Sequence, residues 1–185
     1  MLIFTAPSGA GKTTIVRHLL HKFEALAFSV SATNRPQRPG EEAGVAYHFL
    51  SDQAFAEKVA AGEFVEYEEV YPGRYYGTLR SEVERIWALG KTVVFDIEVK
   101  GATNIKEMYP EQATAVFVDP PSSEILFQRL RDRNTESEAD LLVRIARAEE
   151  ELSYRDTFDR VLLNDDLATA LGEAEEIVRE VVGVI

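Results

Sequence analysis

The residues whose types and spacing most clearly suggest chemistry lie in a loop near the N-terminus, Thr5–Thr14, which reads TAPSGAGKTT. The loop ends in Gly-Lys-Thr, which closes the phosphate-binding pattern G-x-x-x-x-G-K-[ST]. In this pattern glycines let backbone N–H groups converge on an anion, Lys12 reaches the β- and γ-phosphates of a nucleotide, and the hydroxyl of Thr13 binds Mg²⁺. The first glycine of the pattern is Ala6 here, which is tolerated where φ is negative. The sequence therefore predicts a phosphate loop that works.

Such a loop needs a strand before it and a helix after it, and the sequence supplies both. Short apolar runs rich in Val, Phe and Leu predict buried strands at Leu2–Thr5, Phe28–Ser31, Thr92–Ile97, Thr114–Asp119 and Arg160–Asn164. Amphipathic stretches predict helices at Lys12–Phe23, Arg80–Leu89, Val99–Tyr109, Ser122–Arg133, Glu138–Arg155 and Leu167–Val182. This alternation indicates right-handed crossovers. We therefore expect an α/β fold, with a five-stranded parallel sheet of the P-loop NTPase type and helices on both of its faces.

Residues 34–79 interrupt the alternation of strands and helices. After a loop rich in proline and glycine come a short apolar run at Tyr47–Leu50, a helix at Ser51–Ala61, an alternating strand at Phe64–Val70 and a turn at Pro72-Gly73. This order of elements predicts a small mixed β lobe inserted into the core. The expected domains are therefore a core of residues 1–33 and 80–185, an inserted lobe of residues 34–79, and a short lid at the polar residues 131–138.

Composition and charge exclude several classes of protein. The chain has 185 residues, of which 45% are hydrophobic and 28% are charged, as in ordinary globular domains. Its net charge of −12 argues against a nucleic-acid polymer as partner, because such binding is driven by a basic surface. No apolar run reaches the roughly 20 residues that a membrane span needs. The chain has no cysteine, which gives weak support to a cytoplasmic location.

Motifs along nearly the whole chain resemble those of guanylate kinases. The similar segments, in family order, are Ala6–Thr13, Ser31–Glu41 with Tyr47 and Phe49, Phe64–Glu66, Tyr75–Thr78, Asp96–Gly101, Arg133–Glu136 with Arg144, and Asn164–Asp166. The family often carries alanine at the position of Ala6, so the loop is identified as a family variant. The resemblance implies transfer of the γ-phosphoryl group of ATP to GMP, giving ADP and GDP, with Mg²⁺ as cofactor. The implied substrates are ATP and GMP, with dGMP as a further candidate acceptor, and the oligomeric state is left open.

The resemblance also implies roles for individual residues. The residues implied to bind the ATP phosphates are Pro7, Ser8, Gly9, Ala10, Gly11, Lys12, Thr13 and Thr14. Those implied to bind GMP are Ser31, Arg35, Arg38, Tyr47, Glu66, Tyr76, Thr78 and Asp96. Lys12, Arg133 and Arg144 are implied to be catalytic, through stabilisation of charge on the transferred group. Asn164 is implied to lie on the adenine side, and Mg²⁺ to be bound by Thr13 and, through water, by Asp96.

The chemistry of these side chains agrees with the implied roles. Arg35 and Arg38 present two planar groups suited to a phosphate dianion. The carboxylate of Glu66 can accept both the N1–H and the N2 amino group of guanine, while Thr78 donates to O6. Each residue has an ordinary alternative when taken alone: the arginines in a solvated loop, Glu66 on a solvated face, and Asn164 as the cap of the last helix.

Other functions remain open at this point, and the sequence departs from the family pattern at three places. A noncatalytic relative that binds a phosphopeptide would have lost phosphate-loop residues that this chain keeps. A GTPase switch would need an Asn-Lys-x-Asp motif, which the sequence lacks. Another nucleoside monophosphate kinase is the nearest enzymatic alternative. The departures are Glu98 in place of aspartate, Asn134 in place of glycine, and a hairpin lengthened at Tyr71-Pro72.

Overall fold

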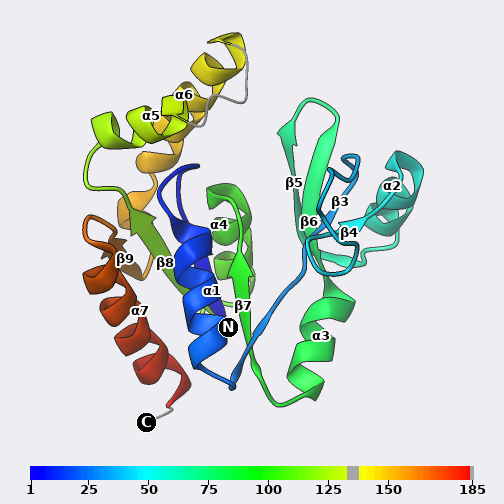
Figure 1. The fold of residues 1–185 in the computed structure, drawn as a ribbon. Helices are drawn as coiled ribbons and strands as arrows, with labels where there is room; N and C mark the ends of the chain where they lie inside the picture. The colour runs from blue at the N-terminus through cyan, green and yellow to red at the C-terminus, as the bar shows by residue number, and fades with distance from the viewer. Residues whose placement is uncertain (133–137, 184–185) are drawn as a thin grey trace. The chain divides into compact units, whose positions relative to one another are not determined.

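A computed structural model describes residues 1–132 and 138–183 of the chain (Figure 1). The chain forms two compact units: the phosphate-loop unit, residues 1–26 and 94–185, and the middle unit, residues 27–93. The strands are β1 Leu2–Thr5, β2 Leu26–Phe28, β3 Ala32–Thr33, β4 His48–Phe49, β5 Phe64–Tyr71, β6 Arg74–Leu79, β7 Thr92–Asp96, β8 Thr114–Asp119 and β9 Arg160–Leu163. The helices are α1 Lys12–Lys22, α2 Asp52–Ala60, α3 Arg80–Ala88, α4 Val99–Met108, α5 Ser123–Asp132, α6 Glu138–Leu152 and α7 Leu167–Val182, with a 3₁₀ turn, η1, at Arg155–Thr157.

The larger sheet confirms the predicted parallel core. Its strand order is β2-β7-β1-β8-β9, and β1 pairs in parallel with both β7 and β8. Leu2 lies opposite Val94 on one side and opposite Thr114 on the other. Every residue of β1 is buried, as expected for a parallel strand covered on both faces. The carboxyl ends of the strands meet at one edge of the sheet, which is where open α/β sheets bind their ligands.

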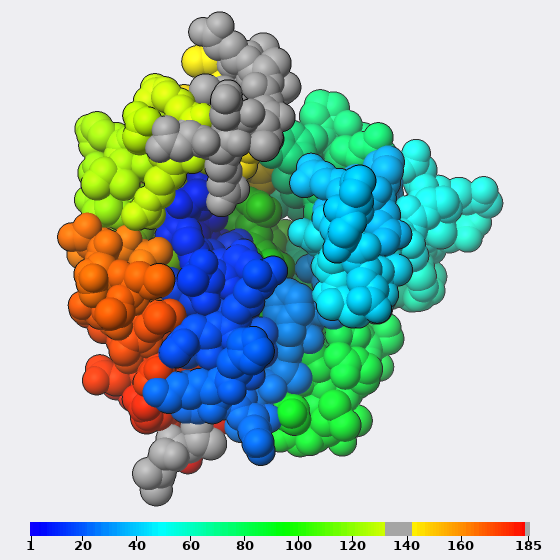
Figure 2. Space-filling view, in the orientation of Figure 1, coloured from blue at the N-terminus to red at the C-terminus, as the bar shows by residue number. Residues whose placement is uncertain are grey.

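Helices cover both faces of this sheet, as the sequence predicts. The helices α1 and α7 pack against each other, and α4 packs against β1 and β8. Figure 1 shows α1 and α7 in front of the strands and α4 behind them, and Figure 2 shows α7 beside α1 on the molecular surface. The buried face of α7 presents Ala170, Ala174 and Val178, which are spaced four residues apart and fully buried.

The middle unit contains the predicted mixed sheet, with the strand order β4-β3-β6-β5. Its small core contains Ala32, Phe55, Phe64 and Leu79, and α2 packs on it through Phe55. Gly77 is needed where β5 and β6 pair, because a Cβ there would lie 2.7 Å from the carbonyl oxygen of Glu66. The helix α2 is capped by Ser51, whose side chain accepts a hydrogen bond from the N–H of Ala54.

Some predicted boundaries are wrong. The strand expected at Phe28–Ser31 lies instead at Leu26–Phe28 and ends before Val30, whose N–H donates to the carboxylate of Glu82 (3.3 Å). The helix expected to reach Arg155 ends at Leu152, where the chain turns toward η1. Residues 133–137 of the predicted lid lie outside the described residues, and the partition into core, lobe and lid stays a prediction.

None of the helices that the structure describes combines the length and the apolar character that a membrane span requires.

Candidate active site

The phosphate loop connects β1 to α1 at the carboxyl edge of the larger sheet. Gly9 and Gly11 have positive φ values of 96° and 92°, a conformation that residues with a Cβ rarely adopt. The N–H of Ala10 donates to the carbonyl of Pro7 (3.1 Å), which closes a tight turn. The helix α1 begins at Lys12 with no side-chain cap. Because the first N–H groups of a helix lack partners within it, this loop has the geometry of an anion site.

Lys12 and Thr13 both contact the aspartate at the end of β7. The Nζ atom of Lys12 lies 2.9 Å from Oδ1 of Asp96 and donates to the carbonyl of Ile97 at 2.7 Å. The hydroxyl of Thr13 donates to Oδ2 of the same aspartate at 2.8 Å. Burial by itself would lower the pKa of Lys12, but the neighbouring carboxylates, Asp96 foremost, raise it above its ordinary value. Lys12 is therefore a positive charge at neutral pH, and the structure brings together three residues that the sequence singled out.

A second cation reaches the loop from α6. The guanidinium of Arg144 donates to the hydroxyl of Ser8 at 2.6 Å, across 136 residues of sequence. This contact brings Arg144, one of the two arginines predicted to be catalytic, to the phosphate loop. The other, Arg133, lies outside the described residues, as does Asn134.

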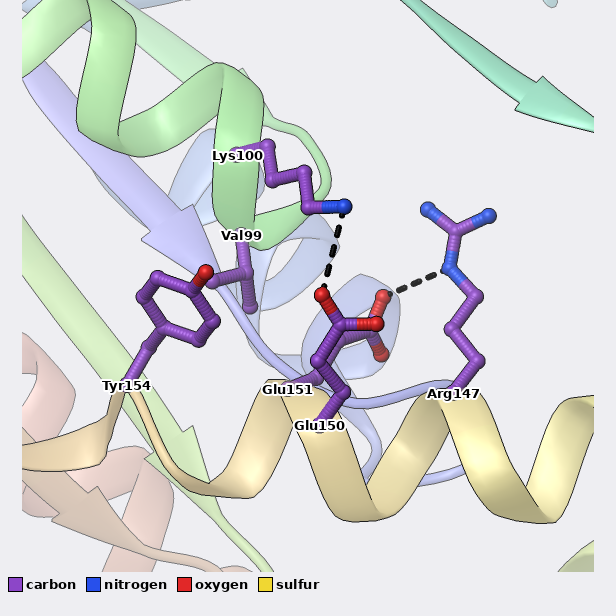
Figure 3. A pocket seen from close by; sticks show the side chains of 6 residues that line it. All are labelled: Val99, Lys100, Arg147, Glu150, Glu151 and Tyr154. Carbon is purple, nitrogen blue, oxygen red and sulfur yellow. Dashed lines mark hydrogen bonds and ion pairs between the residues drawn. The ribbon is translucent and has the colours of Figure 1, made fainter.

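Charged residues at the start of α4 and the end of α6 line a small pocket, shown in Figure 3. Nε of Arg147 lies 2.9 Å from Glu151, and the same guanidinium lies 3.5 Å from Glu98. Lys100 forms an ion pair with Glu150 at 3.3 Å. Burial, reinforced by Glu98, raises the pKa of Glu151, and Arg147 acts in the opposite direction.

Arg147 and Glu151 were not predicted as site residues. The available signal was their spacing of four residues on a predicted helix, but that spacing is common on solvated helix faces. Only the packing of α6 shows that Glu151 is buried, with 6% of its surface exposed. The sequence left Glu98 without a role, and the structure shows that it pairs with Arg147 on α6.

In the middle unit, a buried arginine is oriented by several side chains. Nε of Arg35 donates to the hydroxyl of Tyr76 (3.1 Å), and its other nitrogens form a two-bond pair with Glu41. The guanidinium lies over the ring of Tyr47, 5.0 Å from its centroid. Arg35 lowers the pKa of Glu41 to about 2, with help from the backbone N–H of Arg38. Arg35 thus binds the carboxylate of Glu41 through two parallel hydrogen bonds, the geometry that also suits a phosphate.

The other two residues predicted for the GMP phosphate lie at the margins of this cluster. The N–H of Arg38 donates to Oε2 of Glu41 at 2.8 Å, and the residue is exposed. The carbonyl of Ser31 accepts from the N–H of His48 at 2.9 Å. Glu41 ends the motif Ser31–Glu41, but the sequence indicated no role for it. In the structure it pairs with the guanidinium of Arg35 and so helps to orient that side chain.

Glu66 and Thr78 face each other across β5 and β6. The hydroxyl of Thr78 donates to Oε1 of Glu66 at 2.7 Å, and the two residues pair in the strand register. Glu66 is 8% exposed and Thr78 is fully buried. Burial raises the pKa of Glu66 to about 7, although the hydrogen bond from Thr78 acts in the opposite direction. The solvated face considered for Glu66 from the sequence is therefore wrong.

Asn164 lies just beyond β9, next to the phosphate loop. Its side-chain nitrogen donates to the carbonyl of Ala10 at 2.7 Å, and the residue is 6% exposed. The alternative that Asn164 caps the last helix is wrong, because the cap of α7 is Asp166, whose carboxylate accepts from the N–H of Thr169.

A glycine-containing loop between a parallel strand and a helix, with a lysine and a threonine meeting a strand-end aspartate, defines a P-loop nucleotide-binding protein. The family model described as guanylate kinase matches residues 1–181. The chain is 48% identical over 184 residues to a guanylate kinase of Bacteroides fragilis, covering 100% of this chain and 90% of that protein. It is 42% identical over 183 residues to a guanylate kinase of Chlorobium chlorochromatii, covering 99% and 96% of the two chains.

A solved structure agrees with these sequence relatives. The crystal structure of guanylate kinase from Anaplasma phagocytophilum matches with a TM-score of 0.78 and 29% identity, over 97% of this chain and 84% of that one. The chain belongs to the guanylate kinase family, and its members are nucleoside monophosphate kinases.

Proposed function

We propose that this protein transfers the γ-phosphoryl group of ATP to GMP and so produces ADP and GDP. Membership of the guanylate kinase family supports the reaction. The single observation that carries it is the contact of Lys12 and Thr13 with the two oxygens of Asp96, beside a loop of anion-binding geometry. The cytoplasmic location stays a prediction.

On the donor side, the loop's backbone N–H groups and Lys12 bind the ATP phosphates. Phosphoryl transfer depends mainly on positioning and on stabilising the charge of the transferred group. Lys12 supplies a fixed positive charge, and Arg144 supplies a second one beside Ser8. Phosphate oxygens compete with Asp96 for Lys12, which frees the carboxylate for other contacts.

The residues present fit Mg²⁺ as the cofactor. Thr13 and Asp96 place two hard oxygen atoms 2.8 Å apart. Mg²⁺ typically takes only one or two protein oxygens and fills its other positions with water and phosphate oxygens. When bound, it neutralises charge on the β- and γ-phosphates.

On the acceptor side, the middle unit holds two sets of groups of opposite character. Arg35 and Arg38, with the hydroxyls of Tyr47 and Tyr76, bind the GMP phosphate. Glu66 accepts the two N–H donors of guanine, and Thr78 donates to O6. Adenine has no donor at N1 and would leave a desolvated carboxylate unpaired. This pair therefore selects GMP over AMP.

A coupled assay of ADP production with the full chain tests the proposal. We expect rapid turnover with ATP and GMP, and much slower turnover with AMP. Lys12→Ala should lower kcat by roughly 10²–10³-fold, because it removes a charge that stabilises the transferred group. Lys22→Ala, at the other end of α1, is the matched control; Lys22 is exposed and its ion pair with Glu175 lies away from the phosphate loop, so turnover should stay near normal.

Two results would contradict the proposal. A preference for AMP would show a different nucleoside monophosphate kinase. Absence of turnover with every acceptor would instead favour a noncatalytic relative that binds a phosphopeptide.

A further inference from the structure

Asn164 makes a buried contact with the phosphate loop, across 154 residues of sequence. Its backbone N–H donates to the carbonyl of Asp119 at 2.8 Å, which continues the pairing of β9 with β8 and fixes the residue in place. Its side-chain nitrogen then donates to the carbonyl of Ala10 at 2.7 Å. A carbonyl can only accept, so the amide nitrogen, and not its oxygen, must face Ala10.

The loop is shaped to admit this amide. A Cβ built on Gly11 would lie 2.3 Å from Nδ2 of Asn164, far closer than any real contact. Gly11 therefore lacks a side chain for two reasons: its positive φ, and the space that the amide occupies. Ala10 is itself 1% exposed, so its carbonyl would be left without water if the amide were removed.

The contact determines the direction of one N–H group. The carbonyl of Ala10 and the N–H of Gly11 belong to the same peptide unit, which is trans. In a trans peptide these two groups point in opposite directions. When Asn164 holds the carbonyl on its own side, the N–H of Gly11 is directed away from Asn164, at the N-terminus of α1.

We propose that Asn164 is a positioning residue for the phosphate loop: by holding the carbonyl of Ala10, it keeps the N–H of Gly11 aimed at the nucleotide's phosphates. The proposal rests on the proposed function of the loop in binding ATP phosphates. This positioning role differs from a contact with adenine. It would affect the binding of the phosphates of any nucleoside triphosphate, whatever the base.

The test uses inorganic tripolyphosphate, a probe that has phosphates and no base, as a competitor of ATP. Asn164→Leu keeps roughly the volume of the side chain and removes the donor without adding a charge beside the phosphates. We expect this variant to weaken the binding of ATP and of tripolyphosphate by the same factor, about tenfold, with the KM for GMP unchanged. Asn104→Leu, the same change at an exposed position of α4, is the matched control and should alter neither.

Other outcomes separate the alternatives. Weaker ATP binding with unchanged inhibition by tripolyphosphate would assign Asn164 to the adenine and overturn the proposal, as would normal affinity for both. If Asn164→Leu does not fold, Asn164→Ala is measured in the same way, and a loss shared equally by both ligands is again required. Wild-type protein that fails to phosphorylate GMP would refute the proposed function, and that result needs no variant.

Discussion

Both units contain a buried glutamate with a raised pKa, Glu66 in one and Glu151 in the other, and the two glutamates are surrounded differently. In the middle unit, Glu66 receives a hydrogen bond from the neutral hydroxyl of Thr78. In the phosphate-loop unit, Glu151 is paired with the guanidinium of Arg147 and lies near a second carboxylate, Glu98. Burial is the largest cause of the raised pKa in both cases.

The difference indicates two uses of a buried acid. A carboxyl group held by a hydroxyl keeps acceptor capacity for a ligand that brings its own N–H donors. A carboxylate paired with an arginine on its own helix has its charge offset within the protein, and it contributes to holding α6, which carries Arg144, against the start of α4. Glu66 is therefore expected to act on substrate, and Glu151 on structure.

The same substitution at both glutamates gives the largest contrast. Glu66→Gln keeps the shape but loses the charge and one acceptor, so KM for GMP should rise about 10- to 150-fold while ATP binding is retained. Glu151→Gln, the matched control, should leave KM for GMP within about twofold. Steady-state kinetics with each substrate varied in turn measures both. Equal effects of the two substitutions on GMP would remove the distinction.

The pH dependence of GMP binding should come next in size. Guanine needs the ionised form of Glu66, whose pKa in the folded protein is raised to about 7. Below pH 7 a proton must leave before GMP binds, so KM for GMP should rise by up to about tenfold per pH unit, and it should level off above pH 7. The GMP phosphate also titrates, with a pKa near 6. Glu66→Gln retains that second titration alone, so a profile identical to that of wild type would contradict the assignment.

Arg147→Gln should test the phosphate-loop unit. It leaves Glu151 buried without its guanidinium, so the free energy of unfolding should fall by about 1–3 kcal/mol at pH 8. The loss should shrink as the pH falls and Glu151 takes up a proton, because its pKa in the folded state is raised. Urea denaturation at several pH values measures this. Adding Glu151→Gln should restore most of the stability, and a double variant no more stable than Arg147→Gln would refute the pairing.

The smallest expected effect concerns Glu98. It is 40% exposed and lies 3.5 Å from Arg147, so the ion pair is partly screened by solvent. Glu98→Gln should change kcat by no more than about fivefold, through the placement of α6, and should leave KM for GMP unaltered. The Arg147→Gln background provides the control, since the part of the effect that passes through the ion pair with Arg147 should be absent there. A large rise in KM for GMP would instead place Glu98 in contact with the acceptor.

The sequence by itself determined the features that depend on local spacing. The phosphate loop followed from two glycines, a lysine and a threonine between a strand and a helix. The parallel sheet followed from alternating apolar runs, and the hairpin of β5 and β6 from Pro72-Gly73 between alternating residues. Glu66 and Thr78 were both assigned to guanine from family positions, and the strand register shows that they are neighbours. The loop, the strands and the hairpin could be predicted because backbone geometry and side-chain periodicity depend on only a few neighbouring residues.

The tertiary structure alone decided the contacts between distant segments. Nothing in the order of residues says that Asn164 donates to Ala10 or that Arg147 pairs with both Glu98 and Glu151. A charged residue on a helix looks the same in sequence whether it faces water or the core. Its burial, and hence its pKa and its partners, depends on which segments the fold packs against it.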